Sequence, residues 1–424
     1  NGKEVTYDNT NIKDYIIGLP KEICVYDGEE KLLRKRQGEY NEYGELTELK
    51  QFYSLYNYSS NYVIYDDYGN IEKVLDGRGA TLTYKYDDVE HMFVKEITQS
   101  GNDTETYTSF IEYDVPMQTK KYETDCNGNK LRYEYDKWQR IKEIWTAYDT
   151  GTTPAVSYEY NTPNNDSFGH HELWYAITNN KVTFDADDSS VIQTVLQIDG
   201  LGRAVRTAKT GFVNGVEGWN ASGAVEYDEK GRVIKEGMTE FIEGALEELL
   251  QSNPQMTSLF TAYEYDEKDR QIKTTLPDGS VQTAEFEING SNSISRTIDP
   301  LGNVSVQETD SRGNIVRVAK KDKEGNLLTK VTYEYNAMGE MLKAFDAKQN
   351  PITVEYDLLG RRTALESLDS GRQEFFYDEC SNLVRENNSV LRENNKQINY
   401  EYDGLNRLVK IDYPDTEDTV YTYG

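Results

Sequence analysis

Residues 166–172 form the densest group of side chains in this sequence that could hold a metal ion. His170, His171 and Glu172 are consecutive, and Asp166 lies four positions before the first histidine. Imidazole nitrogens and carboxylate oxygens are ligands that zinc takes in proteins. Adjacent residues of a strand point to opposite faces, so both histidines reach one ion only if the segment is a loop. We therefore favour the interpretation without a metal, and we expect no metal site and no cofactor.

Two aspartate-rich stretches share part of the pattern of a calcium-binding loop. They are DCNGN at 125–129 and DADDS at 185–189, and neither supplies the bidentate glutamate that closes such a loop. The sequence contains no G-x-S-x-G, H-E-x-x-H or phosphate-binding motif. The many carboxylates show no distinguishable acid–base pair, because a turn explains nearly every aspartate. We predict no catalytic residues and no enzyme.

Composition excludes several classes of partner. The formal net charge of -29 and the isoelectric point near 4.6 repel phosphate backbones, so we expect no nucleic-acid binding. No apolar run reaches the roughly 18 residues of a membrane-spanning helix. Cys24, Cys126 and Cys380 lie far apart and form no C-x-x-C pair, which indicates isolated thiols. The chain begins without methionine and both ends look cut, so we expect a segment of a longer protein.

One short phrase recurs along the chain and predicts β-hairpins. It reads Tyr-x-Tyr-Asp-x-x-Gly-(Asn/Arg)-aliphatic, and YEYDKWQRI at 133–141 is one copy. The alternation of Tyr133 and Tyr135 about Glu134 is the period of a strand. Aspartate hydrogen-bonds the backbone two residues on, and glycine supplies the positive φ that closes the loop. The predicted structural turn residues are Asp66, Gly69, Asp136, Asp199, Gly202, Asp228, Gly231, Asp299, Gly302, Asp310, Gly313, Asp357, Gly360 and Asp403.

In some copies of the repeat another residue stands at the glycine position. Asn and Asp tolerate the left-handed region, but Gln139 at the glycine slot is expected to cost about 1 kcal/mol, so Gln139→Gly should stabilise the fold.

Hydrophobic residues make up 37% of the chain, and 34 tyrosines take the place of a conventional core. Tyrosines at alternate positions, such as Tyr400 and Tyr402, are expected to pair with tyrosines of the neighbouring strand.

The spacing of the copies predicts an all-β fold. Asp299 and Asp310 are 11 residues apart, which leaves room for one strand and one turn, so consecutive strands run antiparallel as a long meander. We expect one continuous segment over 1–424 that forms a curved, spiralling single-layer sheet. Its less regular parts are the start at 1–60, an irregular connection at 146–195 and a helical insertion at 239–252. The last, TEFIEGALEELLQS, has apolar residues at helical spacing and predicts one short helix near 240–251.

Several blocks go beyond the generic hairpin. They are GLPKEICVYDGEEKLLR at 18–34, GRGATLTYKYDDVEHMFVKEITQS at 77–100, NGNKLRYEYDKWQRIKEI at 127–144 and the block IDGLGRAVRTAKTGFVNGVEGWNASGAVEYDEKGRVIKEG at 198–237. The chain resembles the YD-repeat, or Rhs, family on these residues. It is most similar to the Rhs shell region of the B component of insecticidal toxin complexes.

The resemblance implies a function as the wall of a container. In that family the meander spirals into a hollow shell that encloses a toxic C-terminal polypeptide. The implied partners are this toxic polypeptide cargo and the remaining shell segments or a partner subunit, and the implied location is secreted or at the surface of a bacterial cell. About 40 strands spaced by about 4.8 Å make little more than one turn of such a shell, so we expect a wall segment of a larger shell. The family's DPxG signature is matched only by DPLGN at 299–303, in an ordinary turn slot.

A second function stays open. The tyrosine rows resemble surfaces that stack on sugar rings, so the chain is alternatively an extracellular carbohydrate- or protein-binding YD-repeat surface module that holds glycans. For the container, the cargo depends on which side of the wall faces inward. A carboxylate-rich inner face would favour a basic cargo.

Overall fold

The computed structural model describes residues 3–8, 18–102, 106–149, 152–161, 173–183, 190–252, 254, 256 and 259–423. These residues form 35 strands and two short helices. The strand pairings among these residues are antiparallel, and nearly all join strands that are consecutive in the chain. The prediction of an all-β antiparallel meander is therefore confirmed.

The strands form two sheets. The 18-stranded sheet contains β1 (Lys3–Asp8), β2 (Leu19–Tyr26), β3 (Leu32–Tyr40), β4 (Leu46–Phe52), β5 (Tyr58–Tyr65), β6 (Ile71–Leu75), β7 (Thr81–Tyr86), β8 (Val94–Ser100), β9 (Thr106–Asp114), β10 (Thr119–Thr124), β11 (Lys130–Tyr135), β12 (Ile141–Trp145), β13 (Val156–Asn161), β14 (Trp174–Lys181), β15 (Val191–Ile198), β16 (Ala204–Val213), β17 (Val216–Ala221) and β20 (Glu240–Glu243). The 17-stranded sheet contains β18 (Val225–Tyr227), β19 (Val233–Gly237), β21 (Phe260–Tyr265), β22 (Gln271–Thr275), β23 (Val281–Asn289), β24 (Asn292–Ile298), β25 (Val304–Thr309), β26 (Ile315–Lys321), β27 (Leu327–Tyr335), β28 (Met341–Phe345), β29 (Pro351–Tyr356), β30 (Arg362–Ser367), β31 (Gly371–Tyr377), β32 (Leu383–Asn387), β33 (Ile398–Tyr402), β34 (Leu408–Asp412) and β35 (Thr419–Val420). The division of the chain into domains stays a prediction.

A register shift recurs in the hairpins and curves the ribbon. In the hairpin of β11 and β12, Tyr133 lies opposite Ile144, but the ladder slips by one residue before Tyr135 meets Ile141. The same slip occurs in the hairpins of β5 with β6 and of β33 with β34. An extra residue on one strand bends that strand and increases its right-handed twist. Repeated bulges therefore turn a flat meander into a coil.

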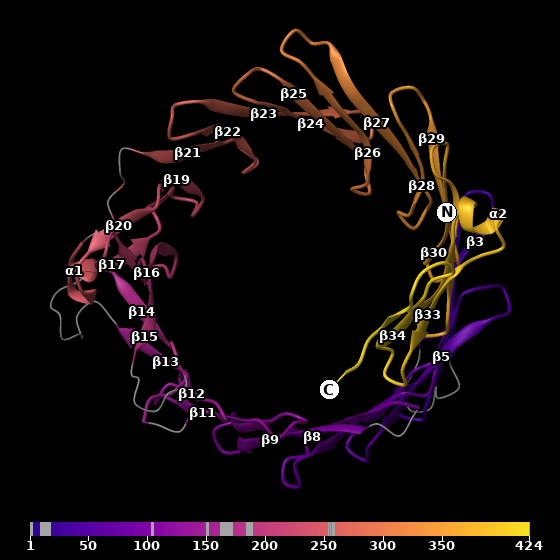
Figure 1. Cartoon of the computed structure of the whole chain (residues 1–424), viewed down its shortest axis with the longest axis horizontal. Coiled ribbons are helices and arrows are strands. Elements are labelled where there is room, and N and C mark those ends of the chain that lie inside the picture. Colours follow the sequence, from indigo (N-terminus) through magenta and orange to yellow (C-terminus); the bar gives the residue numbers. More distant parts are fainter. Residues whose placement is uncertain are drawn as a thin grey trace.

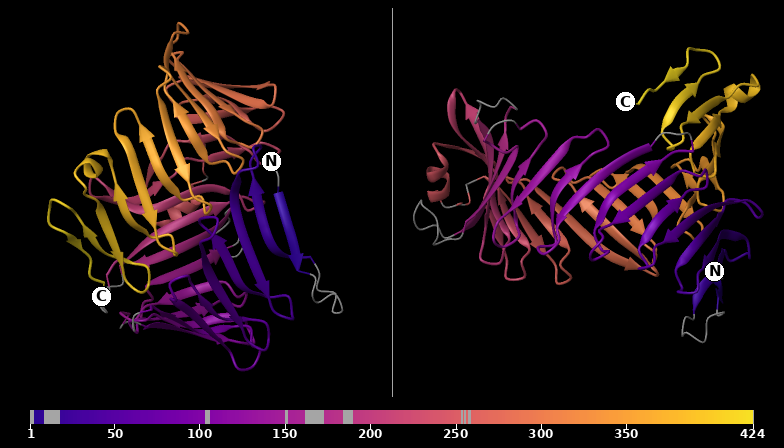
Figure 2. Two further views of the ribbon diagram at one scale, coloured as in Figure 1. Left: turned by 90° about the vertical axis from the view of Figure 1, so that its right-hand side faces the viewer. Right: turned by 90° about the horizontal axis from the view of Figure 1, so that it is seen from below.

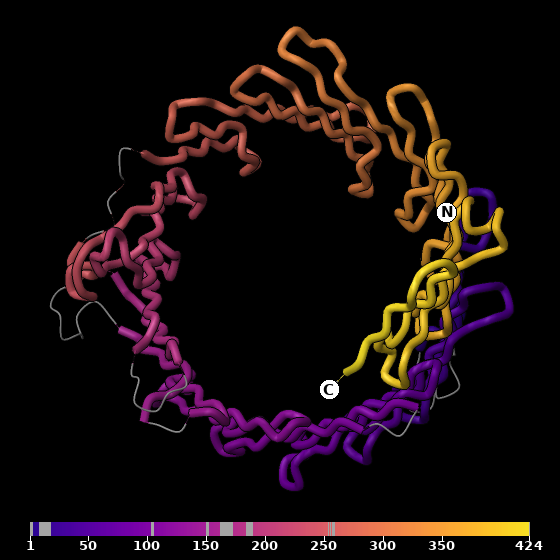
Figure 3. Tube along the Cα trace, in the orientation of Figure 1, coloured from indigo at the N-terminus to yellow at the C-terminus, as the bar shows by residue number. Residues whose placement is uncertain are grey.

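The coil closes into a ring that overlaps itself. Figures 1 and 3 show the strands following one another around a ring, with the first and last strands meeting on its right-hand side. Figure 2 shows that these two ends are displaced along the axis of the ring, so β28 to β34 lie beside β3 to β7 on a second level. The ribbon thus makes little more than one turn, which agrees with the length expected from the repeat.

The helices differ from the sequence-based expectation. Helix α1 (Leu246–Gln251) is shorter than predicted, because Glu240–Glu243 extends the first sheet as β20 and pairs with β17. Gly244, at φ 108, separates that strand from the helix. A second helix, α2 (Ser389–Glu393), was not predicted, although Asn388 caps it by accepting the N–H of Leu391 at 2.9 Å.

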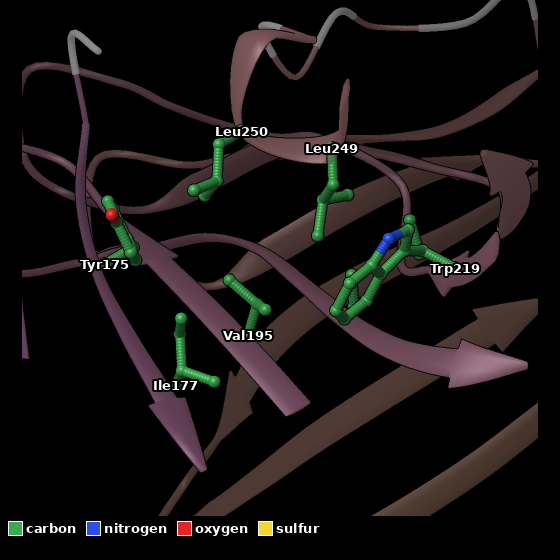
Figure 4. Packing of buried hydrophobic residues seen from close by; sticks show 8 residues of the cluster. Tyr175, Ile177, Val195, Trp219, Leu249 and Leu250 are labelled. Atoms are coloured by element: carbon green, nitrogen blue, oxygen red, sulfur yellow. The ribbon is translucent and has the colours of Figure 1, made fainter. Parts of the chain in front are cut away.

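The largest buried cluster lies under α1. Leu249 and Leu250 are fully buried against Ile177, Val195 and Trp219, and Figure 4 shows the two leucines pointing from the helix onto the strands. A single-layer sheet has no second sheet to cover it, so a helix that covers one face supplies the local core. The predicted irregular connection at 146–195 contains β13, β14 and the start of β15 among its described residues.

Candidate functional surface of the wall

The turn that joins two strands is held by one carboxylate. The Oδ1 atom of Asp310 accepts the N–H groups of Arg312 and Asn314, both at 2.9 Å, and its Oδ2 atom accepts Nδ2 of Asn314 at 3.0 Å. Gly313 completes the turn at φ 90 and donates its N–H to the Asp310 carbonyl at 3.1 Å. One aspartate therefore satisfies two backbone donors that the strand ladder leaves unpaired.

The structure places the other predicted turn residues in the same arrangement. Their Oδ1 atoms accept the N–H groups two and four residues on at Asp66, Asp136, Asp199, Asp228, Asp299, Asp357 and Asp403. Positive φ is found at Gly69, Gly202, Gly231, Gly302 and Gly360. Where glycine is missing, Gln139, Asp269, Ser381 and Asn406 take positive φ instead, at 62, 62, 69 and 63.

The fifth turn residue is usually arginine or asparagine and stabilises the carboxylate. The guanidinium of Arg232 lies 2.6 Å from Oδ2 of Asp228, and the Arg232 N–H and side chain hold the pKa of Asp228 below its ordinary value. The Asn314 amide does the same for the pKa of Asp310. The lowered pKa keeps these carboxylates ionised, and so able to accept the hydrogen bonds of the turn, over a wider range of pH.

Tyrosines join successive turns through their hydroxyl groups. Tyr160 donates its hydroxyl to the carbonyl of Ile141 at 3.0 Å, and the Arg140 guanidinium lies 4.1 Å from the centre of its ring. The ring is thus clamped between a carbonyl and the cation of the previous turn. The same hydroxyl-to-carbonyl bond is made by Tyr40, Tyr65, Tyr86, Tyr227, Tyr265, Tyr335, Tyr356, Tyr377, Tyr402 and Tyr423.

The expectation that tyrosines pair across strands is wrong at Tyr400 and Tyr402. They lie opposite Ile411 and Leu408 in the ladder. A period-two pattern places tyrosines on one face of a strand, but the register of the neighbouring strand decides what each one meets.

Helix α1 identifies the outer face of the first sheet. Figure 1 shows α1 outside the ring, and it packs on Ile177, so side chains on the same face as Ile177 point outward. Ile177 lies opposite Glu159, and the ladder passes from there to Glu143 and Glu134. The intervening tyrosines and aliphatic residues therefore point inward, and in this stretch they are Tyr133, Tyr135, Ile144, Val156, Tyr158 and Tyr160.

This placement contradicts a carboxylate-rich inner face in the first sheet. The ion pairs Lys85–Glu96 at 2.7 Å and Lys130–Glu112 at 3.1 Å belong to the outer face by the same register. Lysine and glutamate flank the inward tyrosines along each strand, and alternation turns them to the opposite side. A basic cargo is not favoured by this surface.

The two overlapping ends of the ring meet turn against turn. Consecutive hairpins turn at opposite edges of the ribbon. We call the edge with turns 27–31, 53–57 and 76–80 rim I, and the edge with turns 41–45, 66–70, 336–340, 357–361, 378–382 and 403–407 rim II. The seam is the contact of rim I, near the start of the chain, with rim II, near its end.

Polar contacts hold the seam, and they involve residues more than 300 positions apart. Arg34 pairs with Glu340, and their side chains are only 16% and 13% exposed. Asn406 donates Nδ2 to Asp76 at 2.8 Å, and Arg78 donates Nη1 to Asn406 at 3.0 Å. These contacts close the ring by side chains instead of a strand ladder.

One thiol lies in the seam. Burial and the adjacent Asp76 carboxylate raise the pKa of Cys380 to about 11, so the thiol is protonated at neutral pH and unreactive. Cys24, Cys126 and Cys380 are all free. The Oδ1 atom of Asp125 accepts two backbone N–H groups, of Asn127 and Asn129, so the stretch 125–129 forms a turn like that of Asp310.

Asp166, His170, His171 and Glu172, which the sequence analysis considered as metal ligands and did not favour, lie outside the described residues, as does the stretch 185–189. Elsewhere, in the part of the chain that the structure describes, no three His, Cys, Asp or Glu side chains are grouped to hold a metal ion. No helix of that part has the length and apolar character needed to cross a membrane.

Comparison with known proteins places the chain among repeat proteins of this kind. Residues 40–417 match the family described as Teneurin YD-shell. Teneurin-4 of Mus musculus and Teneurin-4 of Homo sapiens are each 23% identical over 363 residues, which cover 81% of this chain. The chain spans only 11% of the length of these relatives.

Solved structures share the fold. A crystal structure of TcdB2-TccC3-Cdc42 matches with a TM-score of 0.74 at 14% identity, over 99% of this chain and 30% of that chain. The Photorhabdus luminescens Tc holotoxin pore matches with a TM-score of 0.74 at 13% identity, over 98% of this chain and 29% of that chain.

Proposed function

The chain belongs to the Teneurin YD-shell family, and we propose that it is a wall segment of a shell that encloses and shields a toxic polypeptide before delivery. Membership confirms the resemblance to YD-repeat proteins. One observation carries the proposal: the repeated tyrosines and the aliphatic residues between them face the inside of the ring, as at Tyr133, Ile144 and Tyr160. Such a face suits an unfolded polypeptide, whose apolar and aromatic side chains are exposed.

Partners and location follow from the same role. The solved structures that share this fold hold TcdB2 together with TccC3. By analogy, this segment would work with the remaining shell segments or a partner subunit and with a toxic polypeptide cargo. A secreted or cell-surface location fits that role. The turn aspartates have structural partners, which agrees with a wall that performs no catalysis.

The alternative, a surface module that holds glycans or proteins on an outward tyrosine face, is less well supported. In the first sheet that face points inward, toward the space that the ring surrounds. This alternative stays a prediction.

Binding of an unfolded chain tests the container. The probe is reduced, carboxymethylated α-lactalbumin, which cannot refold, titrated against the full chain by fluorescence anisotropy. Leu196→Ser removes an inward side chain that is 39% exposed, and Ile64→Ser removes an outward one that is 45% exposed. Burial of a leucine side chain contributes about 1.5 kcal/mol, so Leu196→Ser should weaken binding about tenfold.

The outward variant is the matched control. Ile64→Ser should leave the affinity unchanged, and circular dichroism of both variants should match the wild type. Equal affinities for the two variants, or a greater loss with Ile64→Ser, would rule out an inner binding face.

A further inference from the structure

Two turns of rim II have the same construction. Turn 41–45 and turn 336–340 both begin with asparagine and end with glutamate. In each turn the asparagine Nδ2 donates to Oε2 of the glutamate at 2.6 Å, in Asn41–Glu45 and Asn336–Glu340 alike. Turn 41–45 lies on the exposed part of the rim, and turn 336–340 lies in the seam. The same construction is therefore seen once uncovered and once in contact with rim I.

In both turns the second carboxylate oxygen points to the next turn along the rim. A Cβ atom added to Gly69 would lie 3.0 Å from Oε1 of Glu45, and one added to Gly360 would lie 2.6 Å from Oε1 of Glu340. Each glutamate therefore faces a hollow between two consecutive turns of rim II. A glycine at the same place in the second turn keeps each hollow open.

The hollow in the seam is filled by an arginine. Arg34 of rim I donates Nη2 to Oε1 of Glu340, and Tyr53 and Leu55 of rim I line the same space. At the exposed rim, no cation lies within ion-pair distance of Glu45 among the described residues. The hollow there measures about 820 Å³ and is lined by Glu45 and the turn that contains Gly69.

The third residue of each turn shows the same difference. In the seam Met338 is 41% exposed and Leu359 is half-buried. On the exposed rim the corresponding residues are Tyr43 and Tyr68, which are 74% and 64% exposed. Large aromatic side chains left this exposed beside a hollow are typical of an interaction surface.

We propose that Glu45 and the hollow between turns 41–45 and 66–70 form a socket for an arginine on rim I of another coil of the shell. Tyr43 and Tyr68 would be covered by that coil as Leu359 is covered in the seam. The proposal rests on the proposed function, because it names the partner of the wall segment. The occupant is a hairpin with an arginine at the position that Arg34 takes in β3.

A second copy of this chain carries arginine at that position in β3 and in β11, and both arginines already have partners. Arg132, the third residue of β11, pairs with Glu134 at 3.4 Å and lies 4.4 Å from the centre of the Trp145 ring. Arg34 is the third residue of β3 and is already engaged in the seam. The third residues of β27 and β29, which follow turns on the same edge as rim I near the end of the chain, are Thr329 and Thr353. The partner is therefore a different shell segment.

A synthetic hairpin tests the socket. The probe is a fluorescent peptide of residues 19–40 with Cys24→Ser, closed by a disulfide between added terminal cysteines so that the hairpin is formed before binding. It is titrated into the full chain by fluorescence anisotropy at low ionic strength. We expect saturable binding that Glu45→Gln weakens at least tenfold and that added salt also weakens. Citrulline in place of Arg34 in the peptide should have the same effect as Glu45→Gln.

Matched variants assign the site. Glu229→Gln removes an exposed carboxylate from another turn and should leave the affinity unchanged. Glu340→Gln should also leave it unchanged, because that carboxylate is already occupied. Absence of saturable binding, equal affinities for Glu45→Gln and Glu229→Gln, or a loss that follows Glu340→Gln would overturn the proposal.

Sedimentation velocity separates the two sources of a partner. Self-association of the chain that Glu45→Gln abolishes would assign the socket to a second copy and contradict the proposal. The hairpin titration uses no cargo, so its failure leaves the container role standing. Failure of the unfolded-chain assay would equally leave the socket intact.

Discussion

Three glutamines occupy turn positions that normally favour glycine. The φ angles of Gln118, Gln139 and Gln349 are 54, 62 and 66. The left-handed conformation costs a residue with a Cβ atom about 1–2 kcal/mol, and glycine avoids this cost. The greater chain entropy of glycine in the unfolded state offsets about 0.5–1 kcal/mol of the benefit. Each Gln→Gly substitution should therefore raise the free energy of unfolding by about 0.5–1 kcal/mol, and the triple variant by about 2 kcal/mol.

Urea denaturation followed by circular dichroism measures this change. The three turns are on separate hairpins and share no partners, so their effects should add. The midpoint should rise while the slope with urea concentration stays the same. The matched control places glutamine at Gly128, Gly313 and Gly325, where φ is positive and a Cβ atom meets nothing within 4 Å, and it should lower the free energy of unfolding.

The two variants must move in opposite directions. A triple Gln→Gly variant that is equally stable or less stable than the wild type would refute the link between φ and residue type in these turns. A glycine-to-glutamine control whose free energy of unfolding is not lowered would refute the same link.

Three further predictions concern the tyrosine bonds, the seam and acid. Tyr265→Phe removes a 2.8 Å hydroxyl-to-carbonyl bond and should lower the free energy of unfolding, measured by urea denaturation, by about 1 kcal/mol. Tyr56→Phe, whose ring is 86% exposed, should leave it unchanged, and equal effects of the two variants would contradict a stabilising role of the bond. A double-mutant cycle of Arg34→Met and Glu340→Gln should give a coupling of about 1–2 kcal/mol that shrinks with salt, and zero coupling at low salt would exclude a role in closing the ring. Because the pKa of Asp310 is lowered in the folded state, its contribution to the free energy of unfolding is complete above the unfolded pKa of about 3.9 and is lost as pH falls below that value. Asp310→Asn should therefore reduce the fall of the urea midpoint on acidification. An unchanged dependence of the midpoint on pH would contradict this contribution.

Local structure was readable from the sequence because each turn depends on residues within five positions of one another. Asp310 bonds the N–H groups of Arg312 and Asn314, and Gly313 supplies the backbone conformation between them. The strands could be predicted for the same reason, since alternation needs only neighbouring residues. The helix near 240–251 was located but overextended, because Phe241 and Ile242 are apolar at helical spacing and also suit the edge of a sheet, where β20 pairs with β17.

Fewer of the contacts on the surface of the wall could be predicted from the sequence. Tyr265 bonds the carbonyl of Val233, 32 residues earlier, and no side-chain pattern marks a backbone carbonyl as an acceptor. The seam pair Arg34 and Glu340 is separated by 306 positions. A signal for the socket existed in the repeated Asn-x-x-Gly-Glu of turns 41–45 and 336–340, but it acquires meaning only when one copy is seen occupied.

The amino-acid sequence by itself determined the hairpin, the antiparallel order and the spacing of the strands, because these follow from short-range hydrogen bonds and side-chain alternation. Only the tertiary structure decided which face of the ribbon turns inward and which turns meet across the seam. Both depend on the twist accumulated over many bulged hairpins, and a small change per hairpin would bring a different pair of turns together.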